Sequence, residues 1–127
     1  SDYALERWSS SHVDHMETIT VKTLDYFFKE ENISGTNIFL KMDTQGYDLE
    51  VFKGATQSLS RVQAVLSEIS LIAVYNDMPN YKQSLSTFEA AGFSVSGLYP
   101  ITRNKDLSLN EVDCVLVNTA SHEQVKK

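Results

Sequence analysis

The stretch that decides the fold is residues 37–55, which read NIFLKMDTQGYDLEVFKGA. Its short apolar run at 38–42 is typical of a strand that is buried on both faces. Polar residues 43–46 end this run, and the apolar side chains that follow recur at helical spacing: Leu49, Phe52 and Ala55. A strand that turns into a helix within about four residues is half of a βαβ unit. Because ligands bind at the carboxyl ends of strands in open α/β sheets, Asp43 lies where a site is expected.

Size and composition predict one globular domain. Its 127 residues divide into an N-terminal arm or edge cover at 1–16, an α/β core at 17–118 and a frayed tail at 119–127. The net charge of −6 argues against a nucleic-acid partner, because phosphate binding needs clustered Lys and Arg. The chain has no apolar run of about 20 residues and no signal-peptide pattern at its start, and Cys114 is interpreted as a buried, reduced thiol. We therefore expect a soluble cytoplasmic protein without a membrane partner, and no metal, because recognised metal-ligand spacings are missing.

Periodicity along the chain predicts alternating strands and helices. The expected strands cover residues 17–21, 38–42, 63–75, 93–99 and 112–117. The expected helices cover residues 24–31 with Thr23 as N-cap, a stretch from near Gly46 to Gly54, 55–61 and 81–91. This order predicts an α/β fold with a mostly parallel sheet and helices on both faces. The last two strands are joined by a polar loop at 100–110, so they should form an antiparallel pair.

Residues 40–55 resemble the signature of the FkbM-type methyltransferases, which depend on S-adenosylmethionine (SAM). The flanking segments that resemble the family's lead-in, next strand and closing strand pair are 20–25, 66–75, 92–93 and 112–117. The resemblance covers about residues 18–118. It implies a partial Rossmann-like methyltransferase fold, SAM as the cofactor and a hydroxyl of a sugar or related metabolite as the methyl acceptor.

The chain departs from the family pattern at its start. A complete methyltransferase of this kind begins with a strand and a Gly-rich loop that cradles the cofactor, whereas the five glycines here are scattered singly. The resemblance is therefore to the C-terminal half of the fold, from the fourth strand onward. We expect a half that neither binds SAM nor catalyses alone, and we assign no cofactor-binding residue. The alternative is a non-catalytic, dimerising or partner-binding module, and a shortened chain, a degenerate gene product and a natural half-domain all stay open.

Two carboxylates are the candidate catalytic residues. Asp43 could act as a base or orient a hydroxyl acceptor, or it could cap the following helix. Glu68 and Lys41 are charges within otherwise apolar strands, so they could form a structural ion pair or belong to the site. The resemblance implies that Asp43 and Glu68 lie near the transfer site.

Five further residues are expected to face the substrate: Thr44, Gln45, Gly46, Tyr75 and Asn76. Gly46 either lets another group come close to the backbone or permits a tight turn, and we favour the turn. Tyr75 and Asn76 resemble the family's acceptor-side loop, and a loop with an aromatic packing anchor is the alternative. Three charged residues of the helix are interpreted as a solvated face: Asp48, Glu50 and Lys53.

Half of such a fold would leave one edge of the strand at 38–42 unpaired. An unpaired apolar edge invites pairing with another strand. Either the strand at 17–21 covers it or a second copy does. We expect a homodimer through this exposed edge, with possible exchange of residues 1–22 between the copies.

Overall fold

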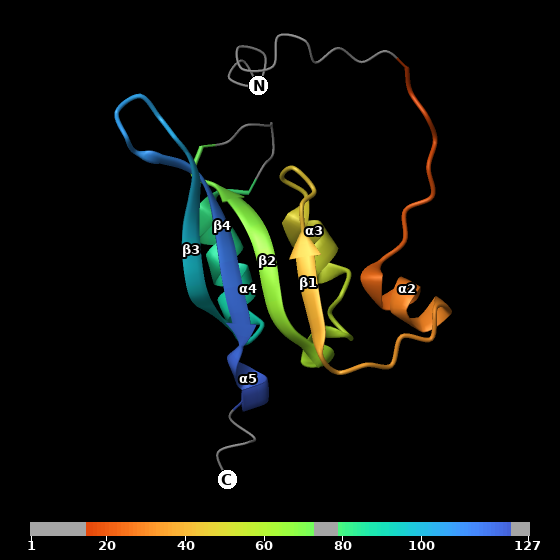
Figure 1. Ribbon diagram of the computed structural model, residues 1–127. Helices are drawn as coiled ribbons and strands as arrows, with labels where there is room; N and C mark the ends of the chain where they lie inside the picture. The colour runs from red at the N-terminus through yellow and green to blue at the C-terminus, as the bar shows by residue number, and fades with distance from the viewer. Residues whose placement is uncertain (1–14, 73–78, 123–127) are drawn as a thin grey trace.

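The computed structural model describes residues 15–72 and 79–122 of the chain. Its strands are β1 (Ile38–Met42), β2 (Val62–Ser70), β3 (Phe93–Arg103) and β4 (Leu109–Asn118). Its helices are α2 (Leu24–Glu30), α3 (Asp48–Lys53), the 3₁₀ helix η1 (Leu59–Arg61), α4 (Tyr81–Ala90) and α5 (Thr119–His122). The four strands form one sheet in the order β1-β2-β4-β3 (Figure 1). The α/β class predicted from the sequence is confirmed.

The expectation of a mostly parallel sheet is wrong. Only β1 and β2 run parallel, whereas β4 is antiparallel to both β2 and β3. The reason is the β3–β4 hairpin, because its second strand, β4, lies between β2 and β3 and pairs with both. A strand inserted in this way opposes both of its neighbours. The predicted antiparallel pairing of the last two strands is confirmed.

The described helices do not cover both faces of the sheet. Figure 1 shows α3 and α4 behind the sheet and α2 beyond β1. The crossovers that contain α3 and α4 both move across the sheet in the same direction, from β1 to β2 and from β2 to β3. Right-handed crossovers that advance in one direction lie on the same face. The opposite face is therefore uncovered by any described helix, and we call it the open face.

Four predicted segments differ from the observed ones. The strand expected at 63–75 ends at Ser70 in β2. Residues 17–21 are extended but belong to no strand, and Ile19 and Val21 are 75% and 77% exposed. A strand needs a hydrogen-bonded neighbour, and no described residue supplies one here. The predicted loop at 100–110 shrinks to 104–108, because Thr102 pairs with Glu111 and Arg103 with Leu109 in a longer hairpin. The predicted helix at 55–61 is reduced to η1 after a series of turns.

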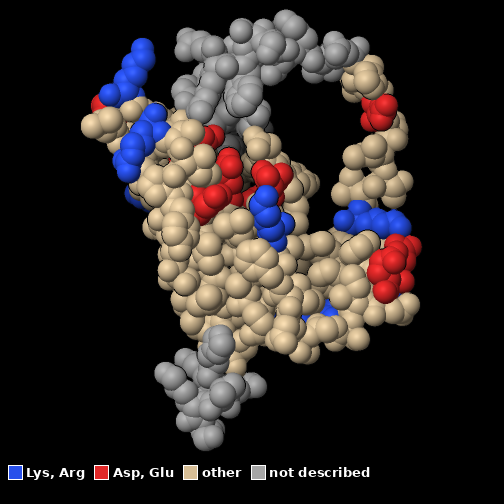
Figure 2. Space-filling view, in the orientation of Figure 1, with Lys and Arg blue, Asp and Glu red and all other residues tan. Residues whose placement is uncertain are grey.

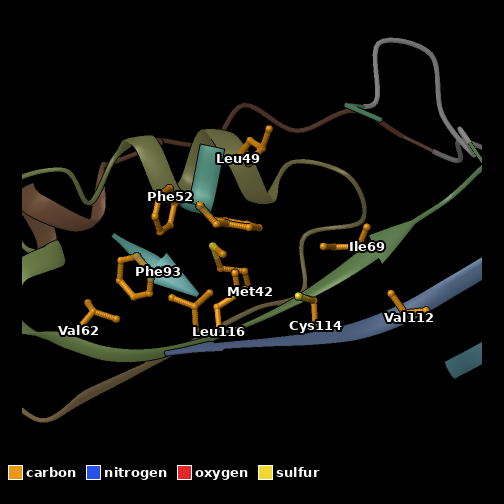
Figure 3. Packing of buried hydrophobic residues seen from close by; sticks show 11 residues of the cluster. Met42, Leu49, Phe52, Val62, Ile69, Phe93, Val112, Cys114 and Leu116 are labelled. Carbon is orange, nitrogen blue, oxygen red and sulfur yellow. The ribbon is translucent and has the colours of Figure 1, made fainter. Parts of the chain in front are cut away.

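The core lies between the sheet and helices α3 and α4 (Figure 3). Phe52 of α3 makes edge-to-face contacts with Phe88 of α4 and Phe93 of β3, at ring-centroid distances of 4.9 Å and 5.7 Å. Alternate residues of β4 point into this core, as the period of a strand requires. They are Asn110, Val112, Cys114, Leu116 and Asn118.

Helix α2 is fixed to the turns that follow α3. The predicted N-cap is confirmed, because Thr23 Oγ1 accepts a hydrogen bond from the Tyr26 backbone N–H. Asp25 accepts from the Gln57 N–H and from Ser58 Oγ, at 2.9 Å and 2.6 Å. Because only Phe28 of this helix is buried, these polar contacts supply much of its attachment.

Candidate functional site at the carboxyl ends of β1 and β2

A tight turn joins β1 to α3 at residues 43–47. Gln45 and Gly46 have φ values of 55° and 100°, which lie in the left-handed region that favours glycine. This geometry supports the interpretation of Gly46 as a turn residue. Helix α3 begins at Asp48, and its N-cap is Tyr47, which makes no side-chain capping bond. The interpretation of Asp43 as the N-cap is therefore wrong, because the helix starts too late for its side chain to cap it.

The side chain of Asp48 anchors this turn through hydrogen bonds. Its side chain is only 8% exposed, and one carboxylate oxygen accepts hydrogen bonds from the Thr44 backbone N–H (3.0 Å) and from Thr44 Oγ1. The other oxygen accepts a bond of 2.6 Å from Ser67 Oγ on β2. Asp48 therefore ties the turn to the neighbouring strand. The expectation of a solvated side chain is wrong for this residue.

The structure brings Asp43 and Glu68 together on the open face. Met42 is the register partner of Ser67, so the residues that follow them, Asp43 and Glu68, lie beside each other at the ends of β1 and β2. Asp43 is exposed and lies near Lys41 Nζ (3.5 Å) and Gln45 Nε2 (3.4 Å). Lys41 thus pairs with Asp43 along its own strand. The alternative of a Lys41–Glu68 ion pair is wrong.

Glu68 lies in an acidic environment. It faces Asp113 directly across β2 and β4, and Glu111 is two residues before Asp113 on the same strand. Burial raises the pKa of the Glu68 carboxyl, and the negative charges of Glu111, Asp43, Asp113 and Asp48 raise this pKa further. We call Asp43, Glu68, Glu111 and Asp113 the acidic cluster. Figure 2 shows acidic side chains gathered over the upper part of the sheet, above a wide uncharged surface.

The pocket beside Glu68 at this end of the sheet is small. The pocket beside Glu68 is bordered by Gly46, Asp48, Ser67 and Pro79 and has a volume of about 20 Å³. That space holds about one water molecule, whereas small-molecule sites have volumes of about 300–1,000 Å³. This pocket by itself is therefore too small for an adenosyl group.

The residues expected to face the substrate lie in different surroundings. Thr44 and Gln45 are exposed in the turn, and Gly46 borders the small pocket. Tyr75 and Asn76 lie outside the described residues. Sequence reasoning missed Asp48 and Ser67. Asp48 could have been found by counting back from Phe52, because residues four apart share one face of a helix, here the core-facing one.

A comparison with protein-family models matches residues 2–95 to the methyltransferase FkbM domain. The chain belongs to the FkbM methyltransferase domain family. The match begins before the resemblance predicted from residue 18 and ends within β3. No curated protein and no solved structure matches the chain.

The described residues contain neither a membrane-spanning helix nor a metal-binding group of side chains. No helix within 15–72 and 79–122 is both long enough and apolar enough to cross a membrane. In the same ranges, no group of three or more His, Cys, Asp or Glu side chains has an arrangement that could hold a metal ion.

Proposed function

We propose that this chain is the acceptor-side, C-terminal half of an FkbM-like, SAM-dependent O-methyltransferase, and that it does not bind SAM or catalyse on its own. The observation that carries the proposal is the position of Asp43 and Glu68, side by side at the carboxyl ends of two parallel strands. Ligands of open α/β sheets bind at such ends. The family to which the chain belongs supplies the reaction class.

Each carboxylate has a role in the proposal that follows from its surroundings. Glu68 is half-buried among like charges, and its raised pKa makes its carboxylate a stronger acceptor for the proton of a substrate hydroxyl. Asp43 is exposed one strand away and accepts a hydrogen bond from a second hydroxyl, which orients the substrate. An acceptor with several hydroxyl groups, such as a sugar, supplies both donors. Residues other than those described here would have to hold the cofactor.

The acceptor site is tested by NMR titration of the ¹⁵N-labelled chain with a panel of monosaccharides. We expect shifts of the amide signals of Asp43, Gln45 and Glu68, and we expect Glu68→Gln to abolish them. The matched control is Glu89→Gln, which changes an exposed carboxylate on α4 and should leave the shifts intact. Signals that do not respond to any hydroxylated ligand would contradict an acceptor site here.

Calorimetric titration with SAM tests the second part of the proposal. The small pocket at the strand ends predicts no measurable heat for the chain alone. Binding in the micromolar range, about −8 kcal/mol, would show that the chain holds the cofactor without help.

The second candidate function is a non-catalytic, partner-binding α/β module. The observation that favours it is the same pocket of about 20 Å³, which is too small to enclose a substrate beside Glu68. The two candidates differ in the NMR titration, because a non-catalytic module gives no response at Asp43 and Glu68.

A further inference from the structure

The side chain of Asp48 is bonded to the chain neighbours of both candidate carboxylates. One of its oxygens accepts hydrogen bonds from the backbone N–H of Thr44 (3.0 Å) and from Thr44 Oγ1, and Thr44 directly follows Asp43. The other oxygen accepts a bond of 2.6 Å from Ser67 Oγ, and Ser67 directly precedes Glu68. A single planar carboxylate therefore connects the two chain segments that carry Asp43 and Glu68.

Asp43 lies where the strand pairing no longer holds the chain. Strand β1 ends at Met42, which is its last residue in register with β2. The hydrogen bonds of the Asp43 side chain itself are exposed and long, at 3.5 Å to Lys41 Nζ and 3.4 Å to Gln45 Nε2. Long, solvent-exposed contacts fix a side chain weakly. The position of Asp43 therefore depends on what anchors the turn that follows it.

The anchor lies in a closely packed, buried place beneath the sheet. Asp48 is 8% exposed and Ser67 is 1% exposed. The pocket that both of them border has a volume of only about 20 Å³, which leaves little room for other side-chain positions. Consecutive residues of a strand point to opposite faces. A bond that holds Ser67 on the covered face therefore also holds Glu68 on the open face.

We propose that Asp48 is a positioning residue, which sets the separation of Asp43 and Glu68 on the open face through its bonds to Thr44 and Ser67. This inference deepens the proposed function and rests on it for its meaning in catalysis. Carboxylates on neighbouring strands, about 4.8 Å apart, suit two hydroxyl groups of one sugar ring. Because a misplacement of about 1 Å can reduce a rate about 100-fold, the separation has to be fixed.

The bond between Ser58 and Asp25 offers a matched comparison. Ser58 Oγ donates to Asp25 at 2.6 Å, the same distance as in the Ser67–Asp48 pair, and Ser58 is also buried, at 4% exposed. This second serine–aspartate bond joins α2 to the turns after α3 and involves no neighbour of Asp43 or Glu68. Loss of either bond should therefore cost similar stability, but only loss of the first should release the carboxylate pair.

The test is a mutant cycle read by NMR titration of the Glu68 side-chain carboxyl in the ¹³C-labelled chain. Burial and the negative charge of Glu111 raise the pKa of Glu68, and the charge of Asp43 raises it further. We therefore expect Asp43→Asn to lower the pKa of Glu68. In a Ser67→Ala background this lowering should fall to about half or less, because the interaction of two charges weakens as they move apart. In a Ser58→Ala background it should equal that in the wild type.

A second pair of variants keeps the test open if Ser67→Ala does not fold. Thr44→Val removes the hydroxyl that donates to Asp48 and keeps the shape of the side chain, whereas Thr44→Ser keeps the hydroxyl. We expect Thr44→Val to reduce the effect of Asp43 on Glu68 and Thr44→Ser to preserve it. Circular dichroism of each variant shows whether its fold is retained.

Three outcomes would overturn the positioning role. An unchanged effect of Asp43→Asn in both Ser67→Ala and Thr44→Val would leave Asp48 with a structural role only. An equal reduction in Ser67→Ala and Ser58→Ala would assign the change to general loosening of the fold. No response of Glu68 to Asp43→Asn in the wild-type background would show that the two carboxylates do not act on each other.

The cycle separates this inference from the proposed function, because it is measured without any ligand. A chain that fails to respond to monosaccharides but shows the expected cycle contradicts the acceptor site and supports the positioning of the two carboxylates. A chain that responds to monosaccharides equally well with and without the Ser67 hydroxyl, and shows an unchanged cycle, supports the acceptor site and contradicts the role of Asp48.

Discussion

Two carboxylates at the same end of the sheet have opposite environments, and the difference comes from their hydrogen-bond donors. Asp48 is buried, but Thr44 and Ser67 supply three donors to it. Glu68 is half-buried beside like charges, and no described donor offsets them. A buried carboxylate with donors stabilises the fold, whereas one among like charges favours the protonated form.

Removal of the Asp48 carboxylate should destabilise the protein strongly. We expect Asp48→Ala to lower the free energy of unfolding by about 3 kcal/mol, because it leaves the Ser67 hydroxyl and the Thr44 N–H without their acceptor. Glu50→Ala is the matched control on the same helix. Its ion pair with Lys53 is solvent-exposed, so a loss of about 0.5 kcal/mol or less is expected. Urea unfolding monitored by circular dichroism measures both, and similar losses would contradict this role of Asp48.

The stability of the protein should depend on pH through Glu68. The folded-state pKa of this group is raised above its ordinary value of 4.5. The favourable contribution of Glu68 to the free energy of unfolding is therefore complete below about pH 4.5. This contribution is lost as the pH rises through the pKa of the folded state. Glu68→Gln should leave the free energy of unfolding unchanged near pH 4 and raise it at pH 7, by at most about 1 kcal/mol after solvent screening. A variant that is less stable than the wild type at pH 7 would contradict this sign.

At the scale of elements, the strand–turn–helix unit from β1 to α3 carries the site. β1 ends at Met42, the turn passes through the left-handed region at Gln45 and Gly46, and α3 begins at Asp48. The turn allows Asp43 to stay on the open face while Asp48 reaches Ser67 beneath it. The conformation of a few turn residues thus separates an exposed carboxylate from a structural one.

Substitution of Gly46 should strain this unit. Because its φ of 100° is unfavourable for any residue with a Cβ atom, we expect Gly46→Ala to destabilise the protein by about 1–2 kcal/mol. Gly35→Ala is the matched control. A Cβ atom at Gly35 meets nothing within 4 Å, and its φ is not in the left-handed region. Thermal unfolding of the two variants should show a lower midpoint for Gly46→Ala only.

At the scale of the whole molecule, the sheet has one covered face and one open face. The covered face contains the core, and the open face carries an uncharged lower part with acidic side chains above it (Figure 2). The β4 residues on the covered face are among the most buried in the protein, and Cys114 is one of them. Exposure of this thiol therefore requires separation of the sheet from its helices.

Reaction of Cys114 should report global unfolding. Burial raises its pKa to about 11, so the reactive thiolate is scarce at pH 8. We expect no reaction with a disulfide reagent in buffer and complete reaction in concentrated guanidinium chloride. A Ser96→Cys variant adds an exposed thiol on β3, which should react at once under native conditions. Rapid reaction of Cys114 in the wild-type protein would contradict the packing of β4.

The local sequence pattern predicted those helices and strands whose ends are set by residues nearby in the chain. Thr23 capped its helix as expected, the apolar run at Ile38–Met42 formed a strand, and Gly54 ended α3. The sequence also predicted that Asp43 would lie at a strand end, because strand ends follow from the same local pattern. The resemblance at residues 40–55 predicted the family.

Contacts between distant segments decided the rest. The Lys41–Glu68 pair was a prediction about two strands whose register no local pattern fixes, and the structure pairs Lys41 with Asp43. Asp48 was expected in solvent because its donor on β2, Ser67, is 19 residues away along the chain. The sequence by itself determined α2, α3 and α4, most of the strands and the family. Only the tertiary structure decided the strand order, the open face and the surroundings of each carboxylate, because these depend on which distant side chains meet.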